Sequence, residues 1–181
     1  CMDSKGVAMG AVATIYEHAK ILKEAGYNVT ILTEKNDYTK PDSWLGEGYD
    51  DILHESSEDE GTVIGPQDFM ILPEVYGGIL EQLKDANCEK IIFVQAYDYI
   101  LELLRPGDSW VQYGVRKAIT TTNSQEKYIN TLFPTVQTTK IDLGIPDYFM
   151  NPTKPKNPFI AIHCRDQRDT SNFIKSFYLK H

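Results

Sequence analysis

The sequence lacks long apolar runs and any stretch typical of a secretory signal. A membrane-spanning helix requires roughly 18 consecutive apolar residues, and no segment approaches that length. No charged, apolar and then small-residue order marks a signal peptide. We therefore expect a cytoplasmic protein without a transmembrane segment, which leaves peripheral contact with a membrane surface open.

The chain also lacks a basic excess and a paired set of cysteines. Lys and Arg number 18 against 26 Asp and Glu, for a formal net charge of −8, and an acidic surface repels nucleic-acid phosphates. Cys1, Cys88 and Cys164 are odd in number and far apart, which argues against a disulfide framework and a zinc site. We expect reduced thiols, no metal and no nucleic-acid partner.

Helix and strand patterns alternate along the chain. After a small-residue turn around Gly10, apolar residues recur at helical spacing as far as Gly26, a candidate C-terminal cap. Further helices are expected over residues 77–86 and 97–104 and from Ser124, as N-cap, to near Pro134. Strand patterns cover residues 29–33, 69–72, 91–94, 118–121 and 135–139. This order predicts an α/β fold, a Rossmann-like three-layer structure in which the first four of these strands share one parallel sheet.

Residues 36–66 do not follow this pattern and are rich in Asp, Glu, Gly and Pro. They include an acidic run formed by Asp50, Asp51, Glu55, Glu58, Asp59 and Glu60. Like charges with little apolar periodicity favour solvent over a packed core. We expect an exposed loop region here, with residues 50–60 mobile or highly exposed.

A domain boundary is expected near Asn151. Residues 151–158 contain three prolines and no apolar residue, a composition typical of a linker. A strand pattern over residues 159–162 and a helical pattern near Phe173 follow. The chain is thus expected to hold one domain over residues 1–150 and the truncated start of a second over residues 159–181. Sheets of this class place a strand before the small-residue turn, so we expect a fragment, or a chain completed by a partner chain or missing segments.

The turn around Gly10 suits a phosphorylated ligand. Small residues let a ligand approach backbone N–H groups, and the start of a helix carries partial positive charge. Glycine also opens many such loops for backbone reasons alone, and this interpretation stays open.

The order of motifs resembles that of the GT-B glycosyltransferases, especially the retaining group described as glycogen-synthase-like or mannosyltransferase-like. Residues 10–32 are similar to the family's glycine loop, first helix and second strand, with Ala11 in place of the second glycine. Residues 118–124 are similar to a family strand that ends in a small polar residue before a helix. Residues 143–149 are similar to its Asn-Gly-Ile-Asp turn followed by Phe, with Leu143 and Pro146 as departures.

The resemblance implies the acceptor-side N-terminal domain of a two-domain enzyme and the start of its donor-binding domain. Such enzymes transfer a sugar from a nucleotide-diphosphate-sugar donor to an acceptor hydroxyl, usually without a catalytic metal. The implied partners are that donor and a carbohydrate or glycolipid acceptor. The donor is a substrate, so no cofactor is implied. Because most of the donor-binding domain lies beyond this chain, the chain alone is expected to be inactive.

Candidate substrate-binding residues follow from the fold and the resemblance together. Ligands of open α/β sheets bind outside the carboxyl ends of strands, and Glu74 and Gln95 each follow a predicted strand. Glu74 would orient an acceptor hydroxyl. Gln95 forms hydrogen bonds but does not titrate, so it cannot act as a general acid or base. The resemblance adds Gly10 and Ala11 as substrate contacts, and no catalytic residue is assigned.

Arg165 is the candidate ligand for the donor phosphates. The resemblance matches it to the arginine of a phosphate-binding Gly-Arg pair, with Cys164 in place of the glycine. A guanidinium there would stabilise charge on the departing diphosphate. The alternative is a surface ion pair with Asp166 or Asp169, worth roughly 0 to 1 kcal/mol.

Other interpretations stay open at this point. Glu74 and Gln95 also fit solvated positions in loops or at helix starts, while His18 and His54 are expected at the surface. A sugar-nucleotide epimerase is one alternative function, and it would need titratable carboxylates facing the cleft. A noncatalytic sugar- or protein-binding module is the other.

Overall fold

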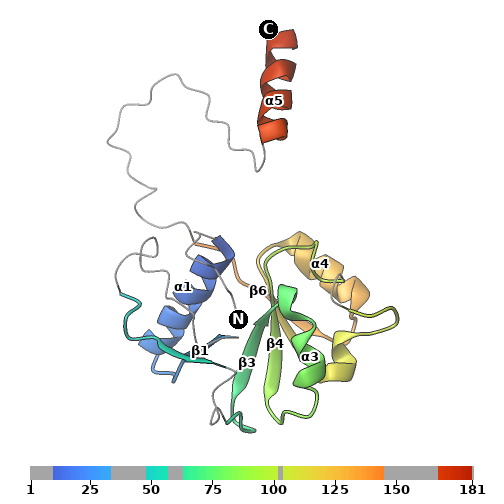
Figure 1. Ribbon diagram of the computed structural model, residues 1–181. Helices are drawn as coiled ribbons and strands as arrows, with labels where there is room; N and C mark the ends of the chain where they lie inside the picture. Colours follow the sequence, from blue (N-terminus) through green and yellow to red (C-terminus); the bar gives the residue numbers. More distant parts are fainter. Residues whose placement is uncertain (1–9, 34–47, 57–62, 102–103, 145–166, 181) are drawn as a thin grey trace. The chain divides into compact units, whose positions relative to one another are not determined.

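The computed structural model describes residues 10–33, 48–56, 63–101, 104–144 and 167–180 (Figure 1). The chain divides into two compact units, Cys1–Leu143 and Gly144–His181. The candidate substrate-binding residues lie in the first unit, and the described part of the second unit is a single helix. Each unit is described by itself.

The described elements of the first unit alternate between helices and strands, as the sequence predicts. They are α1 (Gly10–Glu24), β1 (Thr30–Thr33), β2 (Leu53–Ser56), β3 (Phe69–Pro73), the 3-10 helix η1 (Glu74–Tyr76), α3 (Ile79–Gln82), β4 (Glu89–Val94), the 3-10 helix η2 (Trp110–Tyr113), β5 (Lys117–Thr120), α4 (Asn123–Leu132) and β6 (Gln137–Lys140). Every described strand pair is parallel. The α/β, Rossmann-like fold class is therefore confirmed.

The strands form two sheets instead of the predicted single one. A four-stranded sheet has the order β3-β4-β5-β6, and a two-stranded sheet pairs β1 with β2. The expectation that residues 29–33 join the main sheet is wrong for the described pairings, because β1 pairs with β2 in the register Thr30↔Leu53. An apolar pattern predicts a strand, but it does not predict which other strand pairs with it.

Helix α1 ends where the sequence predicts. Gly26 has a φ of 92°, and its N–H donates to the Lys23 carbonyl at 2.9 Å while the Tyr27 N–H donates to the Leu22 carbonyl at 3.1 Å. These are the two bonds of a Schellman cap, which requires the left-handed conformation that glycine adopts without strain. The cap turns the chain sharply into β1.

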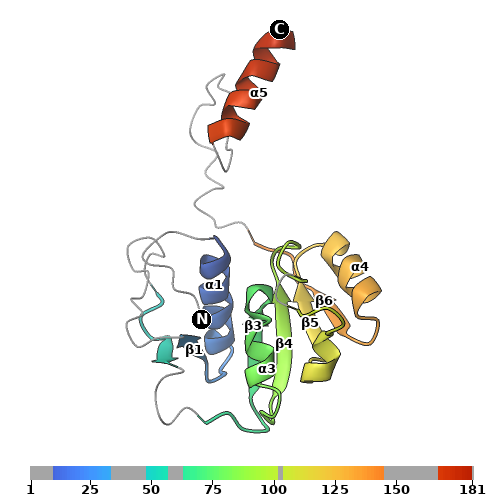
Figure 2. The same cartoon turned by 45° about the vertical axis from the view of Figure 1, so that its right-hand side comes forward.

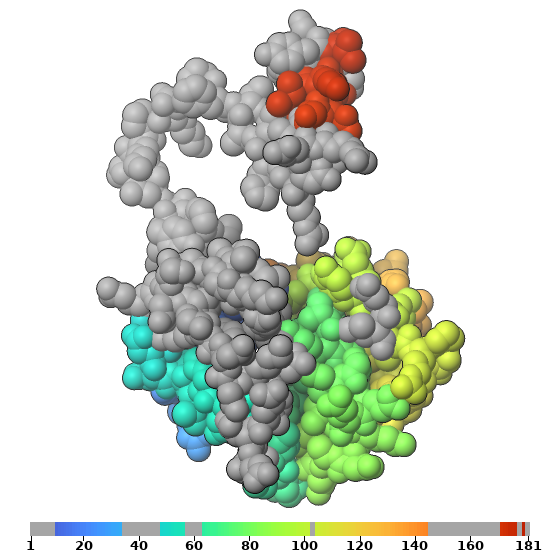
Figure 3. All heavy atoms as spheres, viewed as in Figure 1, coloured from blue at the N-terminus to red at the C-terminus, as the bar shows by residue number. Residues whose placement is uncertain are grey.

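The region predicted as an exposed acidic loop contains strand β2, so that expectation is wrong in part. Tyr49 and Ile52 pack in one buried cluster with Val12, Tyr16 and Ala19 of α1. Asp50 and Asp51 are exposed, and residues 48–56, teal in Figure 3, contribute to the surface. The remaining acidic residues, Glu58, Asp59 and Glu60, lie outside the described residues. Tyr49 and Ile52 flank the charged residues Asp50 and Asp51, and their apolar side chains hold the segment against α1. This packing explains why the segment is not exposed throughout.

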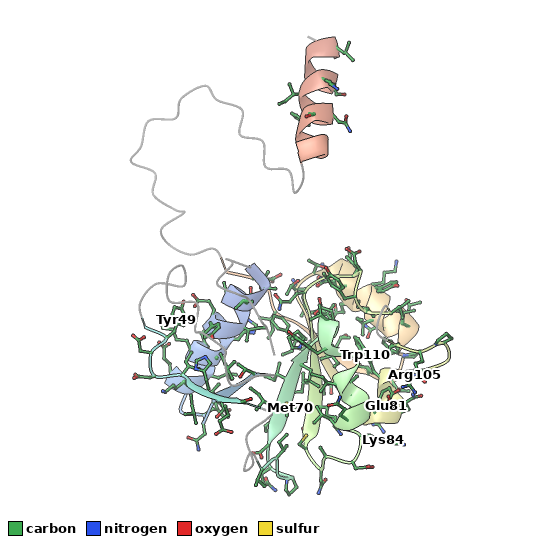
Figure 4. The ribbon with its side chains drawn as sticks, in the orientation of Figure 1. Tyr49, Met70, Glu81, Lys84, Arg105 and Trp110 are labelled. Carbon is green, nitrogen blue, oxygen red and sulfur yellow. The ribbon has the colours of Figure 1, made fainter. Side chains whose placement is uncertain are left out.

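The main core lies on one face of the four-stranded sheet. Ile92, Val94 and Ala118 point to this face and pack with Leu80 of α3 and Ile129 of α4 in a larger buried cluster. The ring of Trp110 in η2 stacks on that of Phe133, with centroids 4.4 Å apart. Trp110 is labelled among the core side chains in Figure 4.

Helix α1 covers the other face of the same sheet. Side chains alternate between faces along a strand, so Phe93 points away from the main core, and its ring stacks on that of His18 at 4.9 Å between centroids. Figures 1 and 2 show α1 on one side of the sheet and α3 and α4 on the other. These are the three layers predicted from the sequence.

One predicted helix is shorter than expected, a second is absent from the described residues of its range, and one predicted cap is wrong. The segment 77–86 contains only the short α3, and residues 97–101 form turns where a helix was expected. The N-cap of α4 is Thr122 in place of Ser124, because Thr122 Oγ1 accepts the Gln125 N–H in a capping box. A capping box needs a reciprocal partner, which Gln125 supplies for Thr122.

The described part of the second unit is α5 (Gln167–Lys180), which confirms the helix expected near Phe173. Phe173 and Ile174 are 47% and 40% exposed within this unit. The predicted linker over residues 151–158 and the predicted strand over residues 159–162 lie outside the described residues.

The main core can be tested with a matched pair of isoleucine substitutions. Ile129 is fully buried and Ile21 is 57% exposed, and both lie on helices. We expect Ile129→Ala to lower the free energy of unfolding by about 2 to 5 kcal/mol, because it removes buried methyl groups and leaves a cavity. Ile21→Ala should change it by no more than about 0.5 kcal/mol. Urea unfolding followed by circular dichroism measures both, and equal losses would contradict the packing.

Candidate functional site

Parallel strands bring their carboxyl ends to the same edge of the four-stranded sheet. Pro73 ends β3, Val94 ends β4 and Thr120 ends β5. The residues that follow these strands are Glu74, Gln95 and Thr121. This carboxyl edge is where ligands bind in open α/β sheets, and it contains two of the residues selected from the sequence.

Glu74 is a buried carboxylate that binds the backbone. Its side chain is 4% exposed. One oxygen, Oε2, accepts the Gln95 N–H at 3.0 Å, and the other, Oε1, accepts the Ala96 N–H at 2.7 Å. These two N–H groups lie just beyond the end of β4 and need a partner when buried. The alternative of a solvated Glu74 is therefore wrong, and its predicted role toward an acceptor hydroxyl has to be indirect.

Gln95 connects three elements of the first unit. Its Nε2 donates to the Ala11 carbonyl in α1 at 3.3 Å, and its own carbonyl accepts from Gln125 Nε2 at 3.1 Å. With the bond to Glu74, three hydrogen bonds hold this residue. None of the hydrogen bonds among the described residues uses the side-chain oxygen Oε1 of Gln95, so this atom can accept a hydrogen bond from a further group. The structure thus brings together Ala11, Glu74 and Gln95, which are far apart in sequence.

Gln125 is a member of this edge that the sequence analysis missed. It is 4% exposed, and its Oε1 accepts the N–H and the Oγ1–H of Thr121 at 2.9 Å and 2.8 Å and the N–H of Thr122 at 3.2 Å. The pattern Thr122-x-x-Gln125 is a capping-box signature. That signal could have identified Gln125 as buried at the start of α4.

Thr120 adds an unusual polar atom to the same edge. Its side chain is fully buried, and its Oγ1 has no hydrogen-bond partner within the described part of the chain. Leaving a buried hydroxyl unpaired costs about 1 to 3 kcal/mol. The edge therefore combines amide and hydroxyl groups with one carboxylate that the backbone occupies, a set suited to hydrogen bonding with neutral hydroxyls.

The start of α1 gives weaker support for a ligand site. Among the described residues, an added Cβ at Gly10 would meet nothing within 4 Å, and Gly10 has no positive φ. Glycine is thus not required by sterics or by backbone conformation at this position. The turn before Gly10 lies outside the described residues, as do Arg165 and Cys164 and most of the motif over residues 143–149.

The two described histidines are half-buried against aromatic neighbours, so they lie only partly at the surface, where both were expected. His54 lies 2.8 Å, measured from Nε2, from the hydroxyl of Tyr16. Burial lowers the pKa of His18 below its ordinary value of 6.5, against a smaller opposing effect of Glu17. Sequence spacing alone could not predict either contact, because each joins α1 to a strand that is distant in the sequence.

Two further features are absent from the described part of the chain, a metal-binding cluster and a membrane-spanning helix. Over the ranges that the structure describes, no group of three or more His, Cys, Asp or Glu side chains is arranged to hold a metal ion. Within the same ranges, no helix combines the length and the apolar character needed to cross a membrane.

The role of Glu74 can be tested against Glu81, which forms an exposed ion pair with Arg105 at 2.7 Å (Figure 4). Glu74→Gln removes the charge and turns an amide N–H₂ toward a backbone donor. We expect a loss of about 2 to 3 kcal/mol in the free energy of unfolding and faster amide exchange at Gln95 and Ala96. Glu81→Gln should cost no more than about 1 kcal/mol. Equal, small effects in urea unfolding would show that the Glu74 bonds do not stabilise this edge.

The pKa of His18 predicts a dependence of stability on pH. The folded state favours the neutral ring, so the unfolded chain binds more protons once the pH falls below about 6.5. Stability contributed by His18 is therefore present above pH 6.5 and decreases as the pH falls from there toward the lower folded pKa. NMR titration of the ring should give a pKa below 6.5. His18→Phe, which keeps an aromatic ring beside Phe93, should remove this part of the pH dependence, and an unchanged profile would contradict it.

Comparison with known proteins identifies no relative of this chain. No protein-family model matches the chain, and neither a curated protein nor a solved structure matches it. The resemblance to GT-B glycosyltransferases therefore depends on the motifs themselves, and the function has to be argued from the site.

Proposed function

We propose that this chain forms the acceptor-side part of a GT-B-type glycosyltransferase, which transfers a sugar from a nucleotide-diphosphate-sugar to an acceptor hydroxyl. The observation that carries the proposal is the hydrogen bond from Gln95 Nε2 to the Ala11 carbonyl. It joins the start of the first helix, where the family resemblance implies a substrate contact, to the carboxyl end of β4, an edge at which open α/β sheets generally bind ligands.

The chemistry of the edge supports an acceptor site. Gln95 offers amide groups, Thr121 offers a hydroxyl, and the carboxylate of Glu74 is held by two backbone N–H groups. Such groups orient a sugar hydroxyl without exchanging protons. Stabilisation of the leaving diphosphate would fall to Arg165 and to a donor-binding domain. The proposed site on this chain therefore binds and positions, and activity requires the second domain.

A noncatalytic sugar-binding module is the second candidate, and one observation favours it. The carboxylate that follows β3, Glu74, is engaged by the backbone through both oxygens, and Gln95 cannot titrate. A binding site needs no acid or base, whereas a transferase must still bring a donor to the acceptor. The same observation weakens the case for an epimerase, which would need a free titratable carboxylate in the cleft.

Acceptor binding can be measured on the chain itself. We expect neutral disaccharides, added at millimolar concentration, to shift the backbone amide NMR signals of Gln95, Ala96 and Thr121. Gln95→Ala should weaken binding at least fivefold, because it removes side-chain groups at the edge. Gln112→Ala is the control, since Gln112 is exposed on η2, before the amino end of β5. Equal binding by both variants, or shifts confined to other regions, would contradict this site.

Transfer itself needs a separate assay. We expect the chain alone to release almost no nucleoside diphosphate from a panel of nucleotide sugars with acceptors, because half of a cleft does not exclude water or fix the donor. The chain joined to a complete donor-binding domain should show acceptor-dependent release. Similar turnover by the isolated chain would overturn the division of roles, and sugar binding without transfer by the joined protein would support the noncatalytic module.

A further inference from the structure

A short turn follows β4 at the carboxyl edge, directly after the residues assigned to the acceptor site. It spans residues 97–101, and the Ile100 N–H donates to the Tyr97 carbonyl at 3.2 Å. Ile100 is 1% exposed and belongs to the main core, so it anchors the turn. Tyr97 and Leu101 of the same turn are 40% and 48% exposed. The turn therefore presents an aromatic and an aliphatic side chain to solvent close to Gln95.

The ring of Tyr97 is held in place by a second aromatic ring. It meets the ring of Tyr128 in α4 edge to face, with centroids 5.6 Å apart and an angle of 75° between the planes. Tyr128 is partly buried and packs against the main core. A T-shaped pair uses one face of one of its two rings, so Tyr128 leaves at least one face of the Tyr97 ring uncovered. A ring that is already fixed and partly exposed stacks on a ligand with little further loss of side-chain freedom.

Two contacts with α4 place this ring beside the Gln95 amide. Gln125 of α4 donates from Nε2 to the Gln95 carbonyl at 3.1 Å. One turn further along α4, Tyr128 contacts Tyr97, which lies two residues beyond Gln95. Two residues span at most about 7 Å, so the ring and the amide lie within reach of one small ligand. Because the Gln95 side chain reaches α1 and the Tyr97 ring reaches α4, a ligand that contacts both lies across the end of β4.

We propose that Tyr97 stacks on the acceptor, and that this acceptor is a neutral pyranose with equatorial ring hydroxyls, such as a β-glucosyl unit. The inference rests on the proposed function, because it places the sugar at the same edge. In such a sugar the axial C–H hydrogens form a flat apolar face, and polarised C–H groups are attracted to the negative face of an aromatic ring. The hydroxyls at the rim of the sugar remain for Gln95, whose Oε1 accepts a hydrogen bond.

The charges near the ring favour a neutral sugar over a nucleotide. An aromatic ring also stacks on nucleobases, so the two classes of ligand have to be distinguished. The segments that follow β3, β4 and β5 are residues 74–78, 95–101 and 121–126, and they contain three carboxylates but no Lys or Arg. The phosphate of a nucleotide is repelled by carboxylates and requires cationic partners. A sugar hydroxyl has no such requirement.

Stacking can be tested on the full chain with cellobiose, a β-linked glucose disaccharide, added at millimolar concentration. Tyr97→Leu keeps an apolar side chain but removes the aromatic face, and it should weaken binding about tenfold, whereas Tyr97→Phe keeps the face and should bind within about twofold of the unchanged chain. Tyr27→Leu is the matched control, because Tyr27 is 62% exposed and follows α1 at the end opposite to Ala11. Saturation-transfer NMR with the unchanged chain should give the strongest signals for the axial C–H hydrogens on one face of the sugar.

The outcomes separate the stacking role from the proposed function. Equal cellobiose binding by Tyr97→Leu and Tyr27→Leu, with weaker binding by Gln95→Ala, would reject stacking and keep the acceptor site. Equal losses in Tyr97→Leu and Tyr97→Phe would also reject stacking. Binding that depends on Tyr97, without transfer by the chain joined to a donor-binding domain, would keep the stacking role and reject the transferase.

Two further results would overturn the proposal. Uridine monophosphate that binds more tightly than cellobiose, with the same loss in Tyr97→Leu, would assign the ring to a nucleobase. Absence of cellobiose binding would reject the β-glucosyl acceptor, and absence of binding by any neutral disaccharide would reject the proposed function as well. Backbone amide NMR spectra of all variants confirm that folded chains are compared.

Discussion

The arrangement of the carboxyl edge depends on one buried carboxylate. A charge removed from water is costly unless hydrogen bonds compensate it, and the side chain of Glu74 receives two successive backbone N–H groups just after β4 ends. Those bonds set the path of the chain at Gln95, whose side chain then reaches α1 and whose carbonyl reaches Gln125. The hydrogen bonds of this one carboxyl group, which follows β3, thus determine how strands and helices meet around the proposed acceptor site.

This arrangement also explains the chemical character of the edge. Because the carboxylate is already engaged, the groups that remain for a ligand are amides and hydroxyls, such as those of Gln95 and Thr121. Amides and hydroxyls select by hydrogen-bond direction more than by charge. An acidic chain with such an edge is better suited to a sugar than to a phosphate at this position, and the phosphates of a donor would require a cationic group such as Arg165.

The sequence predicted those features that depend on local apolar patterns. Residues 69–72, 91–94 and 118–121 are apolar runs with few alternatives to a buried strand, and they form β3, β4 and β5 with small shifts in their ends. Strand β2, with the sequence Leu-His-Glu-Ser, has no such pattern, and only its pairing with β1 defines it. The role of Glu74 was not predictable for a related reason, since its partners lie 21 and 22 residues away. Ser124 and Thr122 are both hydroxyl residues at a helix start, and the reciprocal bond to Gln125 alone distinguishes them.

Gln125 takes part in two hydrogen-bonded structures, and this affects which substitutions the protein tolerates. Its backbone N–H and side-chain oxygen complete the cap of α4, while its side-chain nitrogen holds the carbonyl of Gln95. Substitutions at Thr122 and at Gln95 therefore share a partner, and energetic effects of residues with a common partner do not add. In an evolving lineage, the acceptable residue at Gln95 would depend on what occupies the start of α4, so the two positions should change together instead of drifting separately.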